Sequence, residues 1–248
     1  MYGIDVSKHN GTIDWVKVAD NRNIEFVIIR TGFGKESTKQ IDSQFERNYA
    51  EAKRNGLLVG AYHYSYAKTT EEARQEAEFC AKIIDGKKFE FPIYFDIEDD
   101  VQQALSKSAC SEMVRAFCNT LESKGYWVGV YSYDSFFQTH LDSTIPQRYA
   151  AWVARVENVF PKYVDKPLIG IHQYSFKGKI DGISGDVDLD ECFKDYPNLI
   201  RSSNKNNYSD KKPTYSVIAK QTGLEFQKAN DVSSYLRKIG MATEIKEE

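Results

Sequence analysis

The segment FPIYFDIE, residues Phe91–Glu98, has the residue types and spacing of an acid pair at the end of an apolar run. Side chains alternate between the two faces of a strand, so Tyr94, Asp96 and Glu98 share one face. The backbone positions of the two acids are then about 6–7 Å apart. Close carboxylates raise at least one pKa and place a protonated acid beside an ionised partner, as glycoside hydrolysis requires. The alternative is a solvated acidic loop, because two further aspartates follow directly.

Two more acids, Asp5 and Asp188, also fall at predicted strand ends. Carboxylates are depleted in strands and costly to bury, so several of them at strand ends indicate a site. Each also has an ordinary explanation, because Asp5 could organise the turn before Asn10 and Asp188 lies in the polar segment DVDLDE. The remaining polar and aromatic candidates at these ends are Tyr62, Tyr64, Tyr131, Trp152, Gln173 and Tyr174. Packing inside a barrel is the competing explanation for the aromatic ones.

A set of strands that end on one rim is needed to bring these residues together. Apolar runs rich in β-branched and aromatic residues predict strands at Tyr2–Ser7, Phe26–Gly32, Leu57–Ser65, Phe91–Glu98, Trp127–Ser132, Tyr149–Arg155, Leu168–Ser175 and Asp186–Cys192. Helical patterns over Ile41–Asn55, Thr69–Asp85 and Ser108–Lys124 separate the earlier strands. Alternation of strand and helix predicts parallel strands, and eight of them predict a closed barrel. Fewer helical residues separate the later strands, so the second half is expected to be irregular.

The fold class is therefore α/β, an irregular TIM-like (β/α) barrel with a small C-terminal α+β appendage. The chain has 248 residues, which matches the roughly 250 typical of such barrels. We expect the barrel at residues 1–197, a linker at 198–213 and the small segment at 214–248. Residues 199–248 contain nine Lys/Arg and six Asp/Glu, a net charge of +3, although the whole chain carries −3. This C-terminal segment is a candidate for cell-wall binding or for self-association.

Composition excludes several classes of function. A net charge of −3 argues against nucleic acid as a partner, and no apolar run is long enough to span a membrane. The start MYGIDVSKHNGTIDW does not have the pattern of a signal peptide. Four cysteines without CxxC spacing favour reduced thiols over a zinc site. We expect no metal and no cofactor, because the histidines have no ligand spacing and no phosphate-binding glycine pattern is present.

Taken in order, these segments resemble glycoside hydrolase family 25, the Chalaropsis-type lysozymes. The matching motifs are GIDVSKHNGTIDW, FVIIRTG, LVGAYHYS, PIYFDIE, WVGVYS, AWVAR, IHQYS and VDLD, which together cover about residues 1–195. The resemblance implies an N-acetylmuramidase that cleaves the β-1,4 bond between N-acetylmuramic acid and N-acetylglucosamine in bacterial peptidoglycan. It also implies an irregular barrel, as expected above. The segment RTGFGK after the second predicted strand departs from the family, which often has a smaller or acidic residue before the glycine.

The resemblance also implies roles for individual residues. Glu98 matches the general acid/base, and Asp96 matches the acid that orients the 2-acetamido group of the substrate. Asp5 and Asp188 match two further acids that line the cleft. The tyrosines, Trp152 and Gln173 named above would shape the sugar subsites. Substrate-assisted attack and direct attack by water both remain open, as does the stereochemical outcome.

Two other classes of function remain open on the sequence alone. One is a metal-dependent hydrolase that uses the same acidic cluster, because hard cations prefer oxygen ligands. The other is a non-catalytic module that binds the cell wall, although such a module has no need of a paired acid. Without a signal peptide, the family reading favours a bacteriophage endolysin, made in the host cytoplasm and released to the wall through a holin pore.

Overall fold

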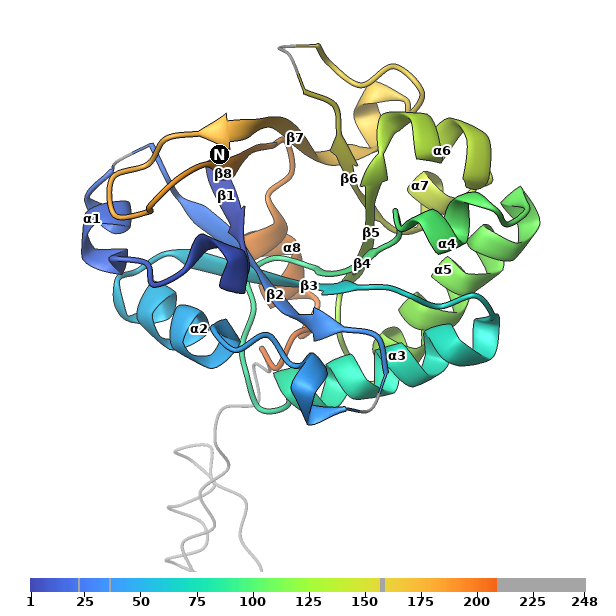
Figure 1. Cartoon of the computed structure of the whole chain (residues 1–248), viewed down its shortest axis with the longest axis horizontal. Coiled ribbons are helices and arrows are strands. Elements are labelled where there is room, and N and C mark those ends of the chain that lie inside the picture. Colours follow the sequence, from blue (N-terminus) through green and yellow to red (C-terminus); the bar gives the residue numbers. More distant parts are fainter. Residues whose placement is uncertain (22, 36, 157–158, 209–248) are drawn as a thin grey trace, which may run out of the picture. The chain divides into compact units, whose positions relative to one another are not determined.

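Eight strands form a closed barrel in the part of the chain that the structure, a computed structural model, describes (Figure 1). The described residues are 1–208, apart from 22, 36 and 157–158. The strands are β1 (Tyr2–Val6), β2 (Phe26–Phe33), β3 (Leu58–Tyr64), β4 (Ile93–Asp96), β5 (Val128–Tyr133), β6 (Ala150–Ala154), β7 (Ile169–Gly178) and β8 (Val187–Cys192). Each strand overlaps one of the eight predicted ranges, so the barrel and the α/β class are confirmed.

Strand direction differs from the prediction at one place. Neighbouring strands from β1 to β7 pair in parallel, but β8 is antiparallel to both β7 and β1. Only residues 179–186 connect β7 to β8. A parallel crossover needs about a dozen residues or more, so this short connection makes a hairpin. The prediction of parallel strands throughout was therefore wrong for the last strand.

Helices surround the barrel on its outer side (Figure 1). The α-helices are α1 (Trp15–Asp20), α2 (Phe45–Arg54), α3 (Thr70–Ile84), α4 (Asp100–Gln103), α5 (Lys107–Ser123), α6 (Asp134–His140), α7 (Ile145–Arg148) and α8 (Tyr196–Ser202). The 3₁₀ helices are η1 (Lys8–Asn10), η2 (Thr38–Gln40) and η3 (Lys166–Leu168). No helix in the described part is long and apolar enough to cross a membrane. The short helices of the second half give the irregularity that the sequence predicts.

Two apolar layers hold the barrel together. The outer layer fills the space between the sheet and helices such as α3 and α5, and it includes Phe95 and Phe117, whose rings stack 4.4 Å apart. The inner layer fills the inside of the barrel, and at the end away from the rim the rings of Phe26 and Phe91 stack 4.4 Å apart. A side chain at Gly3 would meet the Phe26 ring at 2.6 Å, so only glycine permits this packing.

The barrel unit extends beyond the predicted boundary at residue 197. Helix α8 spans that position, and its Ile200 is fully buried. Asn206 is also fully buried; its side chain accepts a hydrogen bond from Trp127 N at 2.7 Å and donates to the carbonyls of Phe89 and Phe91. The first compact unit of the chain is Met1–Asp210. The rest of the predicted linker and the segment 214–248 lie outside the described residues.

Candidate active site

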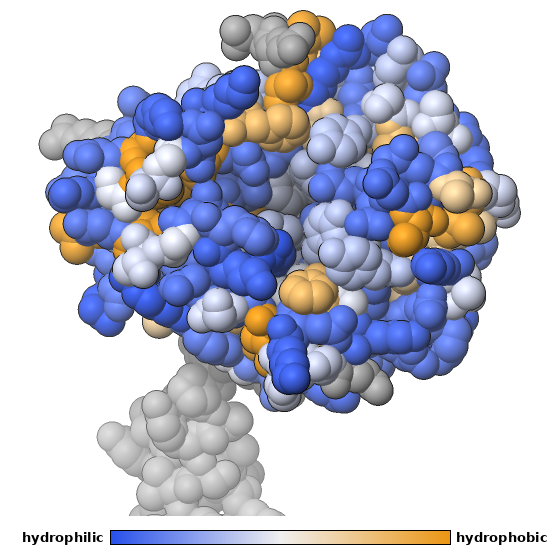
Figure 2. Space-filling view, viewed as in Figure 1, coloured by the Kyte–Doolittle hydropathy of each residue, from blue (hydrophilic) through white to orange (hydrophobic). Residues whose placement is uncertain are grey.

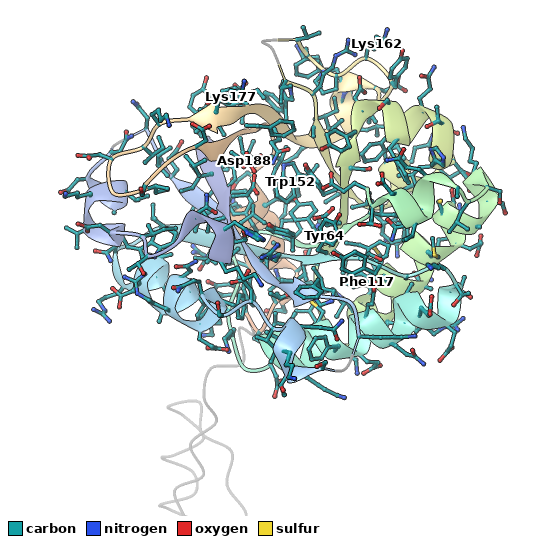
Figure 3. The ribbon with its side chains drawn as sticks, in the orientation of Figure 1. Tyr64, Phe117, Trp152, Lys162, Lys177 and Asp188 are labelled. Carbon is teal, nitrogen blue, oxygen red and sulfur yellow. The ribbon has the colours of Figure 1, made fainter. Side chains whose placement is uncertain are left out.

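The predicted acids meet at the rim where the parallel strands end. Figure 2 shows a hollow in the middle of this face, bounded mostly by hydrophilic residues. Figure 3 places Asp188, Trp152 and Tyr64 around the same central region, from β8, β6 and β3. Because β8 runs in the opposite direction, the beginning of that strand, and not its end, reaches the rim. Asp188 is accordingly the register partner of Asp5.

Asp96 and Glu98 occupy the end of β4 and the first residues beyond it. Asp96 is 3% exposed, and burial followed by the charge of Glu98 raises its pKa well above the usual value, against the opposing charge of Arg30. Burial, then the charges of Asp188 and Asp99, raise the pKa of Glu98 to about 7. One oxygen of each acid is buried with no hydrogen-bond partner among the described residues. The site can therefore hold a proton on Glu98 near neutral pH and offers free acceptors to a substrate.

A chain of hydrogen bonds crosses the site from β5, next to Asp96, to β1. The Tyr131 hydroxyl on β5 donates to Gln173 Oε1 on β7 at 2.7 Å. The amide nitrogen of Gln173 then donates to Asp5 Oδ2 on β1 at 2.6 Å. Burial, followed by the charges of Asp190 and Asp188, raises the pKa of Asp5. Because all three linked side chains are buried, the chain sets their orientation before any substrate arrives.

Asp190 is the principal acid that the sequence analysis missed. It is fully buried on β8 and accepts a hydrogen bond from Trp152 Nε1 at 2.7 Å. Burial raises its pKa to about 8, and the nearby Asp188 adds to the rise. Burial likewise raises the pKa of Asp188 to about 6. The alternation in VDLD places Asp188 and Asp190 on one face, so the rule applied to Asp96 and Glu98 would have found this residue.

Five of the six remaining candidates join the acids. Trp152 is buried at the centre of an aromatic group, with the Tyr131 ring 4.4 Å and the Tyr62 ring 5.9 Å away. Gln173 is part of the hydrogen-bonded chain. Tyr64 also lies at the site, with its hydroxyl donating to Asp99 Oδ2 at 3.0 Å. The aromatic residues are therefore packed against one another and also placed beside the acids, two positions that the sequence treated as alternatives.

Tyr174 is placed differently from the other candidates. It falls at a register shift between Gln173 and Ser175 and lies outside the hydrogen-bonded chain. Its ring packs against His172, 6.2 Å away, and His172 Nε2 is itself hydrogen-bonded to the carbonyl of Arg155. The structure therefore does not bring Tyr174 into the group formed by the other candidates.

Arg30 is a second residue that the sequence analysis missed. It lies on β2, is 9% exposed, and its Nε donates to Asp42 Oδ2 at 2.8 Å. Its charge opposes the rise in the pKa of Asp96. Within the described residues, no group of three His, Cys, Asp or Glu side chains is arranged to hold a metal ion. Arg30 is thus a cationic side chain whose charge acts on Asp96.

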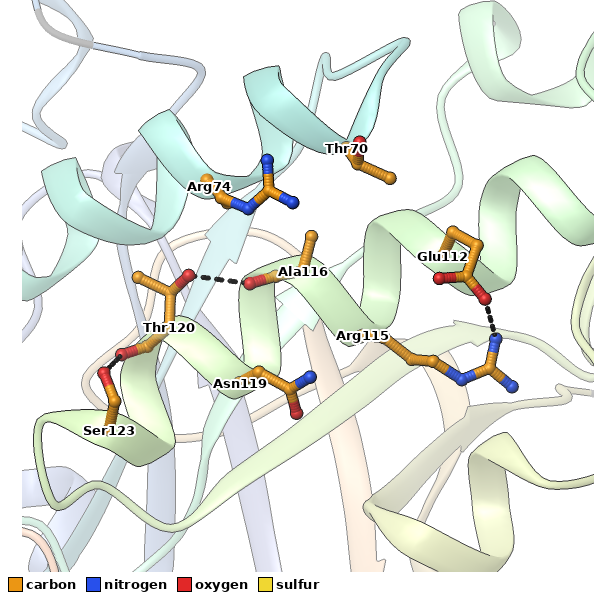
Figure 4. Close-up of a pocket in the computed structure, with 8 residues that line it drawn as sticks. All are labelled: Thr70, Arg74, Glu112, Arg115, Ala116, Asn119, Thr120 and Ser123. Carbon is orange, nitrogen blue, oxygen red and sulfur yellow. Dashed lines mark hydrogen bonds and ion pairs between the residues drawn. The ribbon is translucent and has the colours of Figure 1, made fainter.

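One cavity of the barrel adjoins the acids, and another lies on its outer side. The first, of about 360 Å³, is lined by Lys8, His9, Arg30, Phe33, Tyr64 and Tyr66. The second, of about 340 Å³, lies between α3 and α5 on the outside of the barrel (Figure 4). Its polar groups largely bond to one another, as in the ion pair of Arg115 with Glu112 at 2.7 Å. We assign no role to this outer cavity.

A barrel whose rim gathers buried, paired acids has the arrangement expected of a glycoside hydrolase. A family model described as glycosyl hydrolases family 25 matches residues 4–183. The chain therefore belongs to glycosyl hydrolase family 25, and the resemblance noted in the sequence is confirmed.

Individual relatives agree with this family. The autolytic lysozyme of Clostridium acetobutylicum is 34% identical over 191 residues, which are 77% of this chain and 55% of that protein. The modular autolysin LytC of Streptococcus pneumoniae is 30% identical with a TM-score of 0.66, covering 76% of this chain and 46% of LytC. The CTP1L endolysin is 27% identical with a TM-score of 0.67, and the match covers 81% of this chain and 69% of that protein. This chain thus spans about half the length of the first two relatives.

Proposed function

We propose that the protein is a peptidoglycan hydrolase, an N-acetylmuramidase that cleaves the β-1,4 bond between N-acetylmuramic acid and N-acetylglucosamine. The observation that carries the proposal is Glu98, an acid with a pKa near 7 beside Asp96 at the rim of a family 25 barrel. The likeness to an autolytic lysozyme supports the substrate class.

In the proposed mechanism, Glu98 donates a proton to the leaving oxygen of the glycosidic bond. Burial and the neighbouring acids raise its pKa to about 7, so that a protonated form is available near neutral pH. Positive charge then develops at the anomeric carbon, and Asp96 stabilises it or orients the 2-acetamido group. A protonated Glu98 no longer opposes the ionisation of Asp96, and the charge of Arg30 favours it. Asp5 and Asp188 line the opposite side of the cleft. Tyr62, Tyr64, Tyr131, Trp152 and Gln173 provide rings and polar groups for the sugar subsites.

The decisive experiment identifies the new reducing ends released from purified peptidoglycan. Muramic acid at those ends is expected of a muramidase, whereas N-acetylglucosamine there would contradict the proposal. A wall-binding module without activity would release neither. Full activity after exhaustive chelation would exclude the metal-dependent alternative. The same assay run with and without a chelator therefore separates all three classes.

We further propose that the enzyme acts on the bacterial cell wall as an endolysin. The likeness to the CTP1L endolysin supports this proposal. Lysis of host cells after the protein is produced together with a holin, and its absence without the holin, would be the expected result. Lysis without a holin would instead indicate an export route of its own.

A further inference from the structure

The cavity beside the acids differs from them in charge. Its lining combines Lys8, His9 and Arg30 with three aromatic residues, and no acidic side chain lines it. The aromatic wall is continuous, because the Tyr66 ring lies 5.9 Å from Phe33 and 5.2 Å from Tyr64. A concave site with aromatic walls and a few cationic groups is suited to an organic anion. Substrate that reaches the acids therefore has a basic neighbour.

Two cationic groups in this cavity have donors to spare. Arg30 uses Nε to bind Asp42, but its Nη2 is buried and has no hydrogen-bond partner among the described residues. Lys8 forms no ion pair with any described residue, and its Nζ lies 5.8 Å from the centre of the Phe33 ring. Buried donors are normally satisfied, so an unsatisfied guanidinium nitrogen points to a missing acceptor. A carboxylate supplies such an acceptor in the geometry that guanidinium prefers.

The cavity and the acid cluster form one continuous region of the rim. Tyr64 lines the cavity, and it is also the register partner of Asp96 across β3 and β4. Arg30 lines the cavity and acts on the charge of Asp96. A sugar placed over the acids would therefore have its substituents within reach of Lys8 and Arg30.

We propose that the cavity lined by Lys8, His9, Arg30, Phe33, Tyr64 and Tyr66 binds a carboxylate carried by the muramic acid unit. This inference rests on the proposed muramidase function. The carboxylate has two sources in peptidoglycan, the lactyl group of a muramic acid without peptide and the peptide stem attached to that group. Arg30 and Lys8 would bind either one, and the aromatic wall would pack against the carbon atoms next to it.

Binding to three tetrasaccharides tests the proposal in the full chain carrying Glu98→Gln, which prevents turnover. The ligands are an N-acetylglucosamine tetramer with no carboxylate, a muramic-acid-containing tetramer without peptide, and the same tetramer with peptide stems. Calorimetry is expected to show tighter binding for at least one ligand that bears carboxylates. Adding Lys8→Gln is expected to weaken that binding about two- to fivefold, the range of a solvent-accessible ion pair. Arg30→Lys, which keeps a cation beside Asp42, should act in the same direction.

The control is Lys82→Gln, which removes the same charge from an exposed position in the last turn of α3. It is expected to leave all three affinities unchanged. Preference for the peptide-free tetramer would identify the lactyl carboxylate, and preference for the stem-bearing tetramer would identify the peptide. Equal affinity for all three ligands, or equal effects of Lys8→Gln and Lys82→Gln, would overturn the inference. If the wild-type protein cleaves peptidoglycan, such a result overturns only the proposed role of the cavity. If the wild-type protein does not cleave peptidoglycan, the proposed function is wrong, and this inference falls with it.

Discussion

Glu98 carries the proton in the proposed reaction, so its replacement is the most direct test at the scale of single residues. Glu98→Gln keeps the shape of the side chain and removes the titratable proton. We expect the rate of glycan cleavage to fall about 10²–10⁴-fold, the usual contribution of general acid catalysis. Release of reducing ends measures the rate, and an unchanged circular dichroism spectrum serves as the folding control. A folded variant that cleaves at the wild-type rate would remove Glu98 from the mechanism.

The other acids are expected to differ in importance. Asp96 ends β4 and Glu98 lies two residues beyond it, and the charge of Glu98 raises the pKa of Asp96. Asp96→Asn should therefore lose activity nearly as severely as Glu98→Gln. Asp5→Asn and Asp188→Asn should lose less, because their strands place them across the cleft. Kinetics on soluble muropeptides give the order, and wild-type kinetics for Asp96→Asn would contradict its role.

The pKa of Glu98 predicts how the rate depends on pH. A general acid must be protonated before reaction, and the pKa of Glu98 is raised to about 7 by burial and by Asp188 and Asp99. The acid is protonated below that value and loses its proton above it, so kcat/KM should fall as the pH rises through about 7. Asp188→Asn removes one of the negative charges that raise this pKa, so its alkaline limb should move to lower pH. An alkaline limb in the same place in both proteins would show that another group controls the rate.

Alternation along one strand was enough to predict the central acid pair, but not every partner of it. Asp96 and Glu98 were found because they end an apolar run in sequence. Asp190 was missed because the alternation that pairs Asp96 with Glu98 was not applied to VDLD, where it places Asp188 and Asp190 on one face. Arg30 was missed because its partner Asp42 comes from a loop after the strand, and spacing alone does not bring that pair together.

At the scale of elements, the segment after α8 is held against the barrel by the hydrogen bonds of Asn206. Asn206 satisfies one backbone donor and two backbone carbonyls that the strands leave unpaired. Asn206→Ala should lower the free energy of unfolding by about 2–3 kcal/mol, because it leaves buried polar groups without partners. Denaturant unfolding measures the change.

Asn207→Ala is the matched control for Asn206→Ala. Both asparagines have positive φ, 54° and 62°, so both substitutions incur the same backbone cost. Asn207 is exposed, and its side chain donates a hydrogen bond to the Lys87 carbonyl. Its replacement should cost less than about 1 kcal/mol. Equal losses in the two variants would show that the backbone conformation, and not the buried hydrogen bonds, holds the segment.

Elements with strong local signals were predicted well, and elements fixed by distant contacts were not. Helix α3 begins after Thr69, whose side chain caps it, and the apolar stripe of the helix is clear in sequence. Helix α8 carries no such pattern, and the polar residues that follow it read as a linker. They are held by Asn206, whose partners are more than 70 residues away in the chain. No local pattern reveals such a contact.

At the scale of the whole molecule, the remaining question is the role of the residues after the barrel unit. Residues 211–248 contain seven Lys/Arg and five Asp/Glu, a net charge of +2 on a chain whose total is −3. Acidic wall polymers attract basic segments, so we propose that these residues help bind the cell wall.

Truncation after Asp210 tests this role, because the first compact unit ends there. Cleavage of short soluble glycan fragments should stay within about twofold of the wild type, since the acids and both apolar layers are retained. Binding to intact cell walls, measured by cosedimentation, should fall and should be more sensitive to salt in the full chain than in the truncated one.

A cut after Leu199 is the contrasting variant. It removes the buried Ile200 and Asn206 and should lower the melting temperature, so any loss of activity there would reflect folding. Unchanged wall binding after the cut at Asp210 would place wall recognition within the barrel.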